Sequence, residues 1–299
     1  MHIRQIFDRH PVTFSLEFFP PKTQQATQEL LDALPEFEAL GPAFVDVTYG
    51  AGGGTREATF TLVNKLATET KMDPIPHLTC VCHDKATIDQ ILESYAQAGI
   101  SNILALGGDL PRDRQDWDRS KDAFRYAGDL VAHIRKFNDK GVHPDRQGFG
   151  IGVAGFPEGH PATPNRLAEM DYLKAKVDAG ADYIVTQLFF DNHDFYDFRD
   201  RCDLAGIKVP IIAGLLPITS TAGLRRMGDL AGGSRFPGKL LRALAACGDD
   251  AAAVRNVGIE WTVSQSRDLL ENNVRGLHYY TLNKADATKH ICQSIGLTV

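Results

Sequence analysis

Apolar segments of strand length alternate with segments of helical spacing along the whole chain. The strand-like runs cover residues 12–19, 44–49, 75–81, 102–107, 149–155, 183–190, 209–216 and 276–282. Helical spacing is found in Gln25–Leu40, Ala58–Thr70, Lys85–Ala98, Phe124–Phe137, Leu167–Ala179, Phe195–Ala205 and Thr221–Leu230. The longer segment Gly238–Asn272 predicts two helices before the last strand. Eight strands, each followed by helix, predict an α/β fold, a closed (β/α)₈ TIM barrel.

A doubly wound open sheet is the alternative architecture. It would predict a glycine-rich fingerprint just after the first strand, where the chain instead reads Pro20-Pro21-Lys22. The sequence shows no linker, low-complexity tract or repeat beyond the strand–helix alternation. We therefore expect residues 1–299 to form a single barrel domain.

The first strand carries one carboxylate, Glu17, in the run TFSLEFFPP. An acid within an apolar strand costs several kcal/mol if it stays charged and unpaired, so it tends to be held neutral. A neutral carboxylic acid at working pH is what a general acid requires. The alternative is a structural carboxylate that caps the next helix or pairs with a buried Lys or Arg.

Polar residues also occur at the carboxyl ends of other predicted strands, where barrel enzymes place their active sites. Each has a structural alternative: His77 as a core histidine, Asp109 as a cap in its glycine turn, and Gln187 as a partner of the backbone. The strand-end residues are Asp46, Thr48, His77, Thr79, Gly107, Gly108, Asp109, Phe156, His160, Gln187, Tyr280 and Lys284.

Composition excludes several classes of protein. Of the 299 residues, 43% are hydrophobic and 23% charged, and the net charge of −6 argues against a nucleic-acid or acidic-membrane surface. No window approaches the about 18 apolar residues of a membrane span, and the charged N-terminus does not resemble a secretion signal. Five scattered cysteines are typical of a reducing cytoplasm. Cys80, Cys82 and His83 lack a second ligand pair, so we expect no metal site.

Several of these segments together resemble the bacterial methylenetetrahydrofolate reductases, which are FAD-containing (β/α)₈ barrels. The resemblance runs in order over essentially the whole chain. The matching motifs are SLEFFPPK at Ser15–Lys22, FVDVTYGAGG at Phe44–Gly53, PHLTC at Pro76–Cys80, LxGDLP at Leu106–Pro111, FPEGHP at Phe156–Pro161, LKAKVDAGADYIVTQLFFD at Leu173–Asp191, GLLPI at Gly214–Ile218 and HYYTLNK at His278–Lys284.

The resemblance implies reduction of 5,10-methylenetetrahydrofolate to 5-methyltetrahydrofolate, with FAD carrying hydride from NADH or NADPH. It implies that Glu17 donates a proton to N10 of the folate and that Asp109 stabilises the cationic 5-iminium form. The loop Tyr49–Gly53 is then expected near a face that nicotinamide and folate share in turn, which predicts ping-pong kinetics. The implied FAD-binding residues are Thr48, His77, Gly107, Gly108, Asp109, Phe156, His160, Glu169 and Lys176, and the implied substrate-binding residues are Gln187, Met227, Tyr280 and Lys284.

The resemblance further implies a homo-oligomer, a dimer or tetramer, without the C-terminal regulatory domain of eukaryotic relatives, and the cysteine usage above predicts a cytoplasmic location. This sequence departs from the family pattern at three positions: Gly107 replaces an arginine, Met227 an aromatic residue and Lys284 an arginine. Arg112 or Arg114 could supply the guanidinium that Gly107 lacks. Two alternatives remain open, a flavin-free barrel that passes hydride directly to folate and a pterin-binding methyltransferase or carrier.

Overall fold

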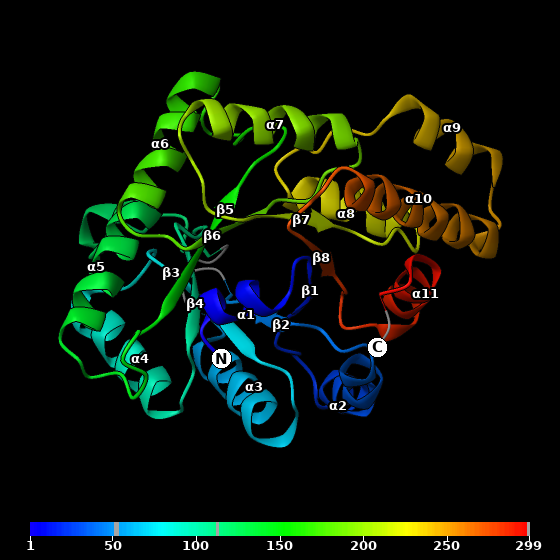
Figure 1. The fold of residues 1–299 in the computed structure, drawn as a ribbon. Helices are drawn as coiled ribbons and strands as arrows, with labels where there is room; N and C mark the ends of the chain where they lie inside the picture. Colours follow the sequence, from blue (N-terminus) through cyan, green and yellow to red (C-terminus); the bar gives the residue numbers. More distant parts are fainter. Residues whose placement is uncertain (51–53, 112–113, 298–299) are drawn as a thin grey trace.

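A computed structural model describes residues 1–50, 54–111 and 114–297. The described chain forms a closed barrel of parallel strands in the order β1-β2-β3-β4-β5-β6-β7-β8, with helices around the outside (Figure 1). The barrel closes because β1 pairs with both β2 and β8. The TIM-barrel prediction is therefore confirmed, and the open-sheet alternative is wrong.

The eight predicted strands are all present, with small differences in their ends. The strands are β1 (Thr13–Phe18), β2 (Phe44–Val47), β3 (Pro74–Thr79), β4 (Asn102–Leu106), β5 (Gly150–Gly155), β6 (Tyr183–Thr186), β7 (Ile211–Leu215) and β8 (Gly276–Tyr280). The helices are α1 (Ile3–Arg9), α2 (Gln24–Ala39), α3 (Arg56–Glu69), α4 (Lys85–Gln97), η2 (Arg119–Lys121), α5 (Ala127–Asp139), α6 (Arg166–Asp178), α7 (Asn192–Leu204), α8 (Thr221–Leu230), α9 (Gly238–Ala246), α10 (Ala251–Glu271) and α11 (Ala285–Ile295).

Two elements differ from the sequence-based expectation. β6 ends at Thr186, four residues before the predicted end, and the Leu188 N–H just beyond it is paired with the side chain of Gln187. α1 was not predicted, although Ile3, Ile6 and Phe7 have helical spacing. The Gly238–Asn272 segment holds α9 and α10, as expected.

Side-chain caps begin several of the outer helices. Thr23 accepts from the Ala26 N–H at the start of α2, and Asp84 accepts from the Thr87 N–H at the start of α4. Such caps satisfy backbone donors that the first helical turn leaves unpaired, and each typically contributes about 1 kcal/mol. Within the described ranges, none of these helices combines the length and apolarity required to cross a membrane.

The barrel strands are buried on both faces, as expected for a parallel sheet. Their outer faces pack against the helices in the main hydrophobic cluster. Their inner faces form a second cluster, which includes Phe44, Ile75 and Tyr183 and extends to Ile6 and Phe7 of α1. α1 thus closes one end of the barrel (Figure 1), and the polar strand ends gather at the opposite, carboxyl end.

Candidate active site

Glu17 lies one residue before the end of β1, at the carboxyl mouth of the barrel. The strand register places it beside Asp46 of β2 and Tyr280 of β8. Its side chain is 19% exposed, so it is less enclosed than the apolar strand pattern predicts. The position at the mouth explains this exposure, and it makes the carboxyl accessible to a ligand.

Two imidazoles flank the Glu17 carboxyl. His77 Nε2 on β3 and His278 Nε2 on β8 each lie 3.7 Å from Glu17 Oε2. Both nitrogens are buried without a hydrogen-bond partner among the described residues. Burial lowers the pKa of His77 to about 4, with the Glu17 charge opposing this effect. His77 is therefore neutral at physiological pH.

A second carboxyl, Asp46, is fully buried behind this group. Its Oδ2 lies 3.5 Å from His278 Nδ1, and neither carboxyl oxygen has a hydrogen-bond partner in the described part of the chain. Burial raises the pKa of Asp46 to about 7; His278 lowers it and Glu17 raises it further. The fully buried acid at this end of the barrel is thus Asp46 on β2.

The turn after β8 holds the end of β1. The hydroxyl of Thr281 donates to the Glu17 carbonyl at 2.7 Å. Asn283 pairs with both backbone groups of Phe19, accepting from its N–H at 3.0 Å and donating to its carbonyl at 2.8 Å. These bonds fix the backbone around Glu17, and they give the Tyr-Thr-Leu-Asn motif a structural role that the sequence did not indicate.

Tyr280 lies at the same mouth, across from β6. Its hydroxyl donates to the Thr186 carbonyl at 2.8 Å, and its pKa is raised well above the usual value, chiefly by burial. Gly214 N–H donates to the Thr186 hydroxyl at 2.9 Å. A Cβ at Gly214 would lie 2.9 Å from the Tyr280 hydroxyl oxygen, so this close approach requires glycine.

The loop after β4 approaches β3 closely. Gly108 has a φ of +79°, and a Cβ there would lie 2.6 Å from Thr79 Cβ. At Gly107, by contrast, a Cβ would have no described atom within 4 Å. The Thr79 hydroxyl beneath the loop is buried without a partner among the described residues, and Asp109 is exposed at the tip. On the neighbouring strand, Thr48 N–H donates to the Phe18 carbonyl and so keeps β1 and β2 together past their ends.

Cationic and acidic side chains meet at the ends of β5 and α6. Lys176 Nζ donates to the Ala154 carbonyl at 2.6 Å, and burial lowers the pKa of Lys176 to about 8, against the opposing charge of Glu169. Glu169 accepts from the His160 N–H at 2.7 Å, and it lies 3.2 Å from Arg166. The Phe156 and His160 rings pack edge to face at 4.6 Å between centroids.

The predicted substrate-binding residues occupy separate parts of the rim. Gln187 follows β6, and its N–H donates to the Gly155 carbonyl at 2.7 Å. Met227 of α8 is partly buried in a cluster with Leu188 and Leu216, which belong to the loops after β6 and β7. Lys284 lies at the N-cap of α11 and is exposed. Within the described residues, none of these three side chains forms a hydrogen bond or ion pair with Glu17 or with the two histidines beside it.

Residues 51–53 of the loop Tyr49–Gly53, which was expected near the nicotinamide, lie outside the described residues. Arg112 lies outside them too. Tyr49, at the start of that loop, shares a 2.9 Å hydrogen bond with His83 Nε2, and His83 Nδ1 lies 2.7 Å from the Val81 carbonyl. Both ring nitrogens of His83 therefore have protein partners. Arg114 lies over the ring of Trp117, 4.6 Å from its centroid.

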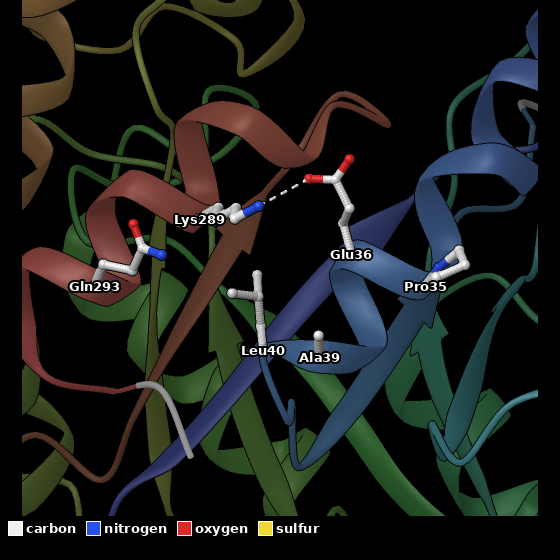
Figure 2. Close-up of a pocket in the computed structure, with 6 residues that line it drawn as sticks. All are labelled: Pro35, Glu36, Ala39, Leu40, Lys289 and Gln293. Carbon is white, nitrogen blue, oxygen red and sulfur yellow. Dashed lines mark hydrogen bonds and ion pairs between the residues drawn. The ribbon is translucent and has the colours of Figure 1, made fainter.

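A surface pocket between α2 and α11 lies outside the barrel. Figure 2 shows Lys289 and Glu36 facing one another across it, with a 3.2 Å ion pair between them. The remaining lining residues are Pro35, Ala39, Leu40 and Gln293. It contains none of the predicted site residues, so we assign it no part in the chemistry.

The sequence indicates Asp46 as a strand-end residue without a role, and it does not single out His278 or Ser15. The signal was present in the alternation of each strand. Ser15 shares the inward parity of Glu17, as His278 shares that of Tyr280. Reading parity across neighbouring strands would have brought these side chains together.

Comparison with known proteins identifies the family of the chain. The family model "Methylenetetrahydrofolate reductase" matches residues 2–296. Among solved structures, a Clostridium thermocellum protein aligns with a TM-score of 0.69 and 17% identity over 100% of this chain and 99% of its own. At this level of identity, the likeness shows that the two proteins share a fold.

Curated relatives include methylenetetrahydrofolate reductase 1 of Schizosaccharomyces pombe, 39% identical over 97% of this chain and 47% of the relative. Methylenetetrahydrofolate reductase (NADH) 1 of Arabidopsis thaliana is 36% identical over 99% of this chain and 50% of the relative. The chain thus spans about half the length of these relatives. The 5,10-methylenetetrahydrofolate reductase of Escherichia coli is 35% identical over 96% of this chain and 91% of its own. The chain belongs to the methylenetetrahydrofolate reductase family.

Proposed function

We propose that this protein reduces 5,10-methylenetetrahydrofolate to 5-methyltetrahydrofolate with electrons from NADH or NADPH. The observation that supports this function most directly is the position of the Glu17 carboxyl at the barrel mouth. Two imidazole nitrogens flank it, and neither has another partner among the described residues. Family membership gives the reaction class, and the Arabidopsis relative is named for NADH.

Glu17 supplies the proton that opens the folate ring. Protonation of N10 allows the bond between N10 and the bridging carbon to break, with its electron pair moving to N10. The lone pair of N5 then forms the 5-iminium cation. General acid catalysis of this kind typically accelerates a step by about 10²–10⁴. Glu17 is suited to the role because it is exposed enough to reach a ligand and its backbone is fixed by the turn after β8.

Asp109 and Gln187 are assigned to the folate. A carboxylate beside the iminium cation stabilises it electrostatically, and exposed Asp109 lies at the tip of the loop after β4. Gln187 offers an amide to the pterin edge, and Lys284 offers a point charge to the glutamate tail. The fold likeness to the C. thermocellum protein, described as binding two copies of 5-methyl-5,6,7,8-tetrahydrofolic acid, agrees with a folate ligand.

The side of the mouth formed by β3 to β6 suits FAD. Gly108 brings the backbone close to β3, where the Thr79 hydroxyl and His77 Nε2 are buried without partners among the described residues. Lys176, His160 and Glu169 provide a cation and polar groups for the phosphates and ribose. FAD bound there would accept hydride from the nicotinamide nucleotide and deliver it to the iminium carbon. Tyr49 and Met227 are the remaining residues that we assign to the rim of this binding site.

The visible absorption spectrum of the freshly purified protein tests this function. We expect a flavin spectrum that bleaches with anaerobic NADH or NADPH and recovers on addition of methylenetetrahydrofolate, with one 5-methyltetrahydrofolate formed per flavin. A colourless protein that takes up no added FAD, yet reduces the folate, would favour the flavin-free alternative. Absence of folate reduction in every case would reject the function. We also propose a homo-oligomeric state and a cytoplasmic location, which light scattering and cell fractionation would test.

A further inference from the structure

Asp46 and His278 take no part in the steps above, yet they lie directly behind Glu17. Both side chains are 0% exposed. Burying a carboxyl without hydrogen bonds costs several kcal/mol, and a buried unpaired group in a native protein calls for an explanation. The barrel interior could hold apolar residues at both positions, as it does at Phe44 and Ile75 in the inner cluster.

One imidazole joins the two carboxyls. His278 Nδ1 lies 3.5 Å from Asp46 Oδ2, and His278 Nε2 lies 3.7 Å from Glu17 Oε2. These separations exceed those of hydrogen bonds, but catalytic hydrogen bonds are often long before the substrate binds and shorten in the complex. The two ring nitrogens thus face one acid each, with the buried acid on one side and the mouth on the other.

We propose that Asp46 stores the proton that Glu17 delivers, and that His278 transfers it between them. The inference rests on the proposed function, because it takes Glu17 as the proton donor. In the transfer, the Asp46 carboxyl proton moves to His278 Nδ1 while the proton on Nε2 moves to the Glu17 carboxylate. Asp46 becomes a carboxylate, Glu17 becomes an acid, and His278 stays neutral with its tautomer exchanged.

The cycle closes with a proton from water. After Glu17 has protonated N10, both Asp46 and Glu17 are carboxylates and His278 carries its proton on Nδ1. A solvent proton then binds the partly exposed Glu17, and the transfer runs in reverse to refill Asp46. One proton enters and one leaves in each turnover, so charge and atoms balance. Asp46 and His278 do not touch the folate and act through Glu17, as positioning residues.

Ser15 permits both tautomers of His278. Its hydroxyl oxygen lies 2.9 Å from His278 Nδ1 and 3.4 Å from the Leu277 carbonyl. The hydroxyl donates to Nδ1 when that nitrogen is bare. It turns toward the Leu277 carbonyl to free the single lone pair of Nδ1 for the Asp46 proton, and it accepts from Nδ1 once that nitrogen is protonated. A hydroxyl, which both donates and accepts, is the group this exchange requires.

The raised pKa of Asp46 suits a group that stores a proton at neutral pH. Burial raises the pKa of Asp46 to about 7, so it holds a proton where an ordinary aspartate would have lost it. The other titratable groups around the relay are His77, Tyr183 and Tyr280. Burial lowers the pKa of His77 to about 4 and raises the pKa values of both tyrosines well above their usual range. These three side chains therefore stay neutral at and around neutral pH.

Stopped-flow kinetics of the two half-reactions test the relay. We compare the wild type with Asp46→Asn and His278→Gln from about pH 6 to 9, a window that spans the Asp46 pKa. Asp89→Asn is the matched control, because Asp89 pairs with His133 at 2.7 Å on the outer helices α4 and α5. We expect the folate step of the wild type to slow as the pH rises through about 7, because the store then empties. Asp46→Asn should slow that step at least about tenfold and remove this pH dependence, with reduction by nucleotide unchanged.

Two results would overturn the relay. One is an Asp46→Asn variant with the wild-type pH profile in the folate step; the other is an equal loss in both half-reactions, because the relay acts in the folate step alone. A wild type without folate reduction would reject the proposed function and the relay together, whereas the first result rejects the relay alone.

A second test uses the wild type, so it does not require that the Asp46→Asn variant fold. It follows the imidazole nitrogens by NMR in protein labelled with ¹⁵N at histidine. We expect one imidazole, assigned by its loss in His278→Gln, to exchange its proton between Nδ1 and Nε2 as Asp46 loses its proton near pH 7. A single fixed tautomer across the same pH window would contradict the proposal.

Discussion

Glu17 and His278 face each other across the seam where the barrel closes, with Glu17 Oε2 3.7 Å from His278 Nε2. The seam is the pairing of β1 with β8, which joins opposite ends of the sequence. The same seam carries the bonds from Thr281 and Asn283 to the backbone around Glu17. Closure of the barrel therefore assembles and fixes the proposed proton donor.

Gly108→Ala should weaken FAD retention strongly. The added methyl would lie 2.6 Å from Thr79 Cβ, at a φ of +79° that disfavours alanine, so the loop must move away from β3. Gly107→Ala is the matched control, because a methyl there would have no described atom within 4 Å. Flavin fluorescence released on dilution measures the retention; equal retention in the two variants would remove Gly108 from the proposed cradle.

Gly107→Arg should tighten FAD retention. The resemblance places an arginine at this position, and the described residues leave open space there for the longer side chain. A guanidinium binds phosphate through two parallel hydrogen bonds, which a glycine cannot provide. The same dilution assay checks this, and unchanged or faster flavin loss would show that the guanidinium has no partner here.

Lys176→Met should release FAD, and wild-type retention should fall as the pH rises through about 8. Burial lowers the pKa of Lys176 to about 8, so the ammonium is charged below that pH and neutral above it. Lys174→Met is the control, since Lys174 pairs with Asp178 on the same helix, whereas Lys176 donates to Ala154 of the barrel. Retention that stays flat as the pH passes through about 8 would argue against a phosphate contact by Lys176.

Asp46→Asn should stabilise the protein relative to the wild type increasingly as the pH rises from about 4 to 8. The unfolded chain loses the Asp46 proton near pH 4, while the folded chain holds it to about pH 7. Wild-type stability therefore falls across this window, by up to about 4 kcal/mol from this group. Urea unfolding at about pH 5 and pH 8 measures the difference; a gap between the two proteins that does not change with pH would contradict the assignment.

The fold could be predicted from sequence because strand periodicity is a local signal. Apolar runs and helical spacing located all eight strands and the helices between them, and a helix after the last strand was implied without its bounds. α1 was missed because seven residues carry too little periodicity to separate from a charged N-terminus. The sequence predicts too long a β6 because Phe189 and Phe190 are buried although they lie beyond the end of the strand at Thr186.

The candidate site could be predicted only in part. Glu17 and His77 were selected as polar residues in apolar strands, and the structure brings them within 3.7 Å. The link between Asp46 and His278 depends on the register of β1 with both β2 and β8, which no single segment reveals. Met227, by contrast, came from the resemblance alone, and it packs in a separate cluster with Leu188 and Leu216.

The most direct test of the central claim uses Glu17→Gln with its two half-reactions measured separately. The amide keeps the size of the side chain but cannot donate a proton as an acid. We expect the variant to retain FAD and to be reduced by NADH at the wild-type rate, but to lose folate reduction by about 10²-fold or more. Methylenetetrahydrofolate reoxidising the reduced variant at the wild-type rate would contradict the assignment of Glu17 as the proton donor.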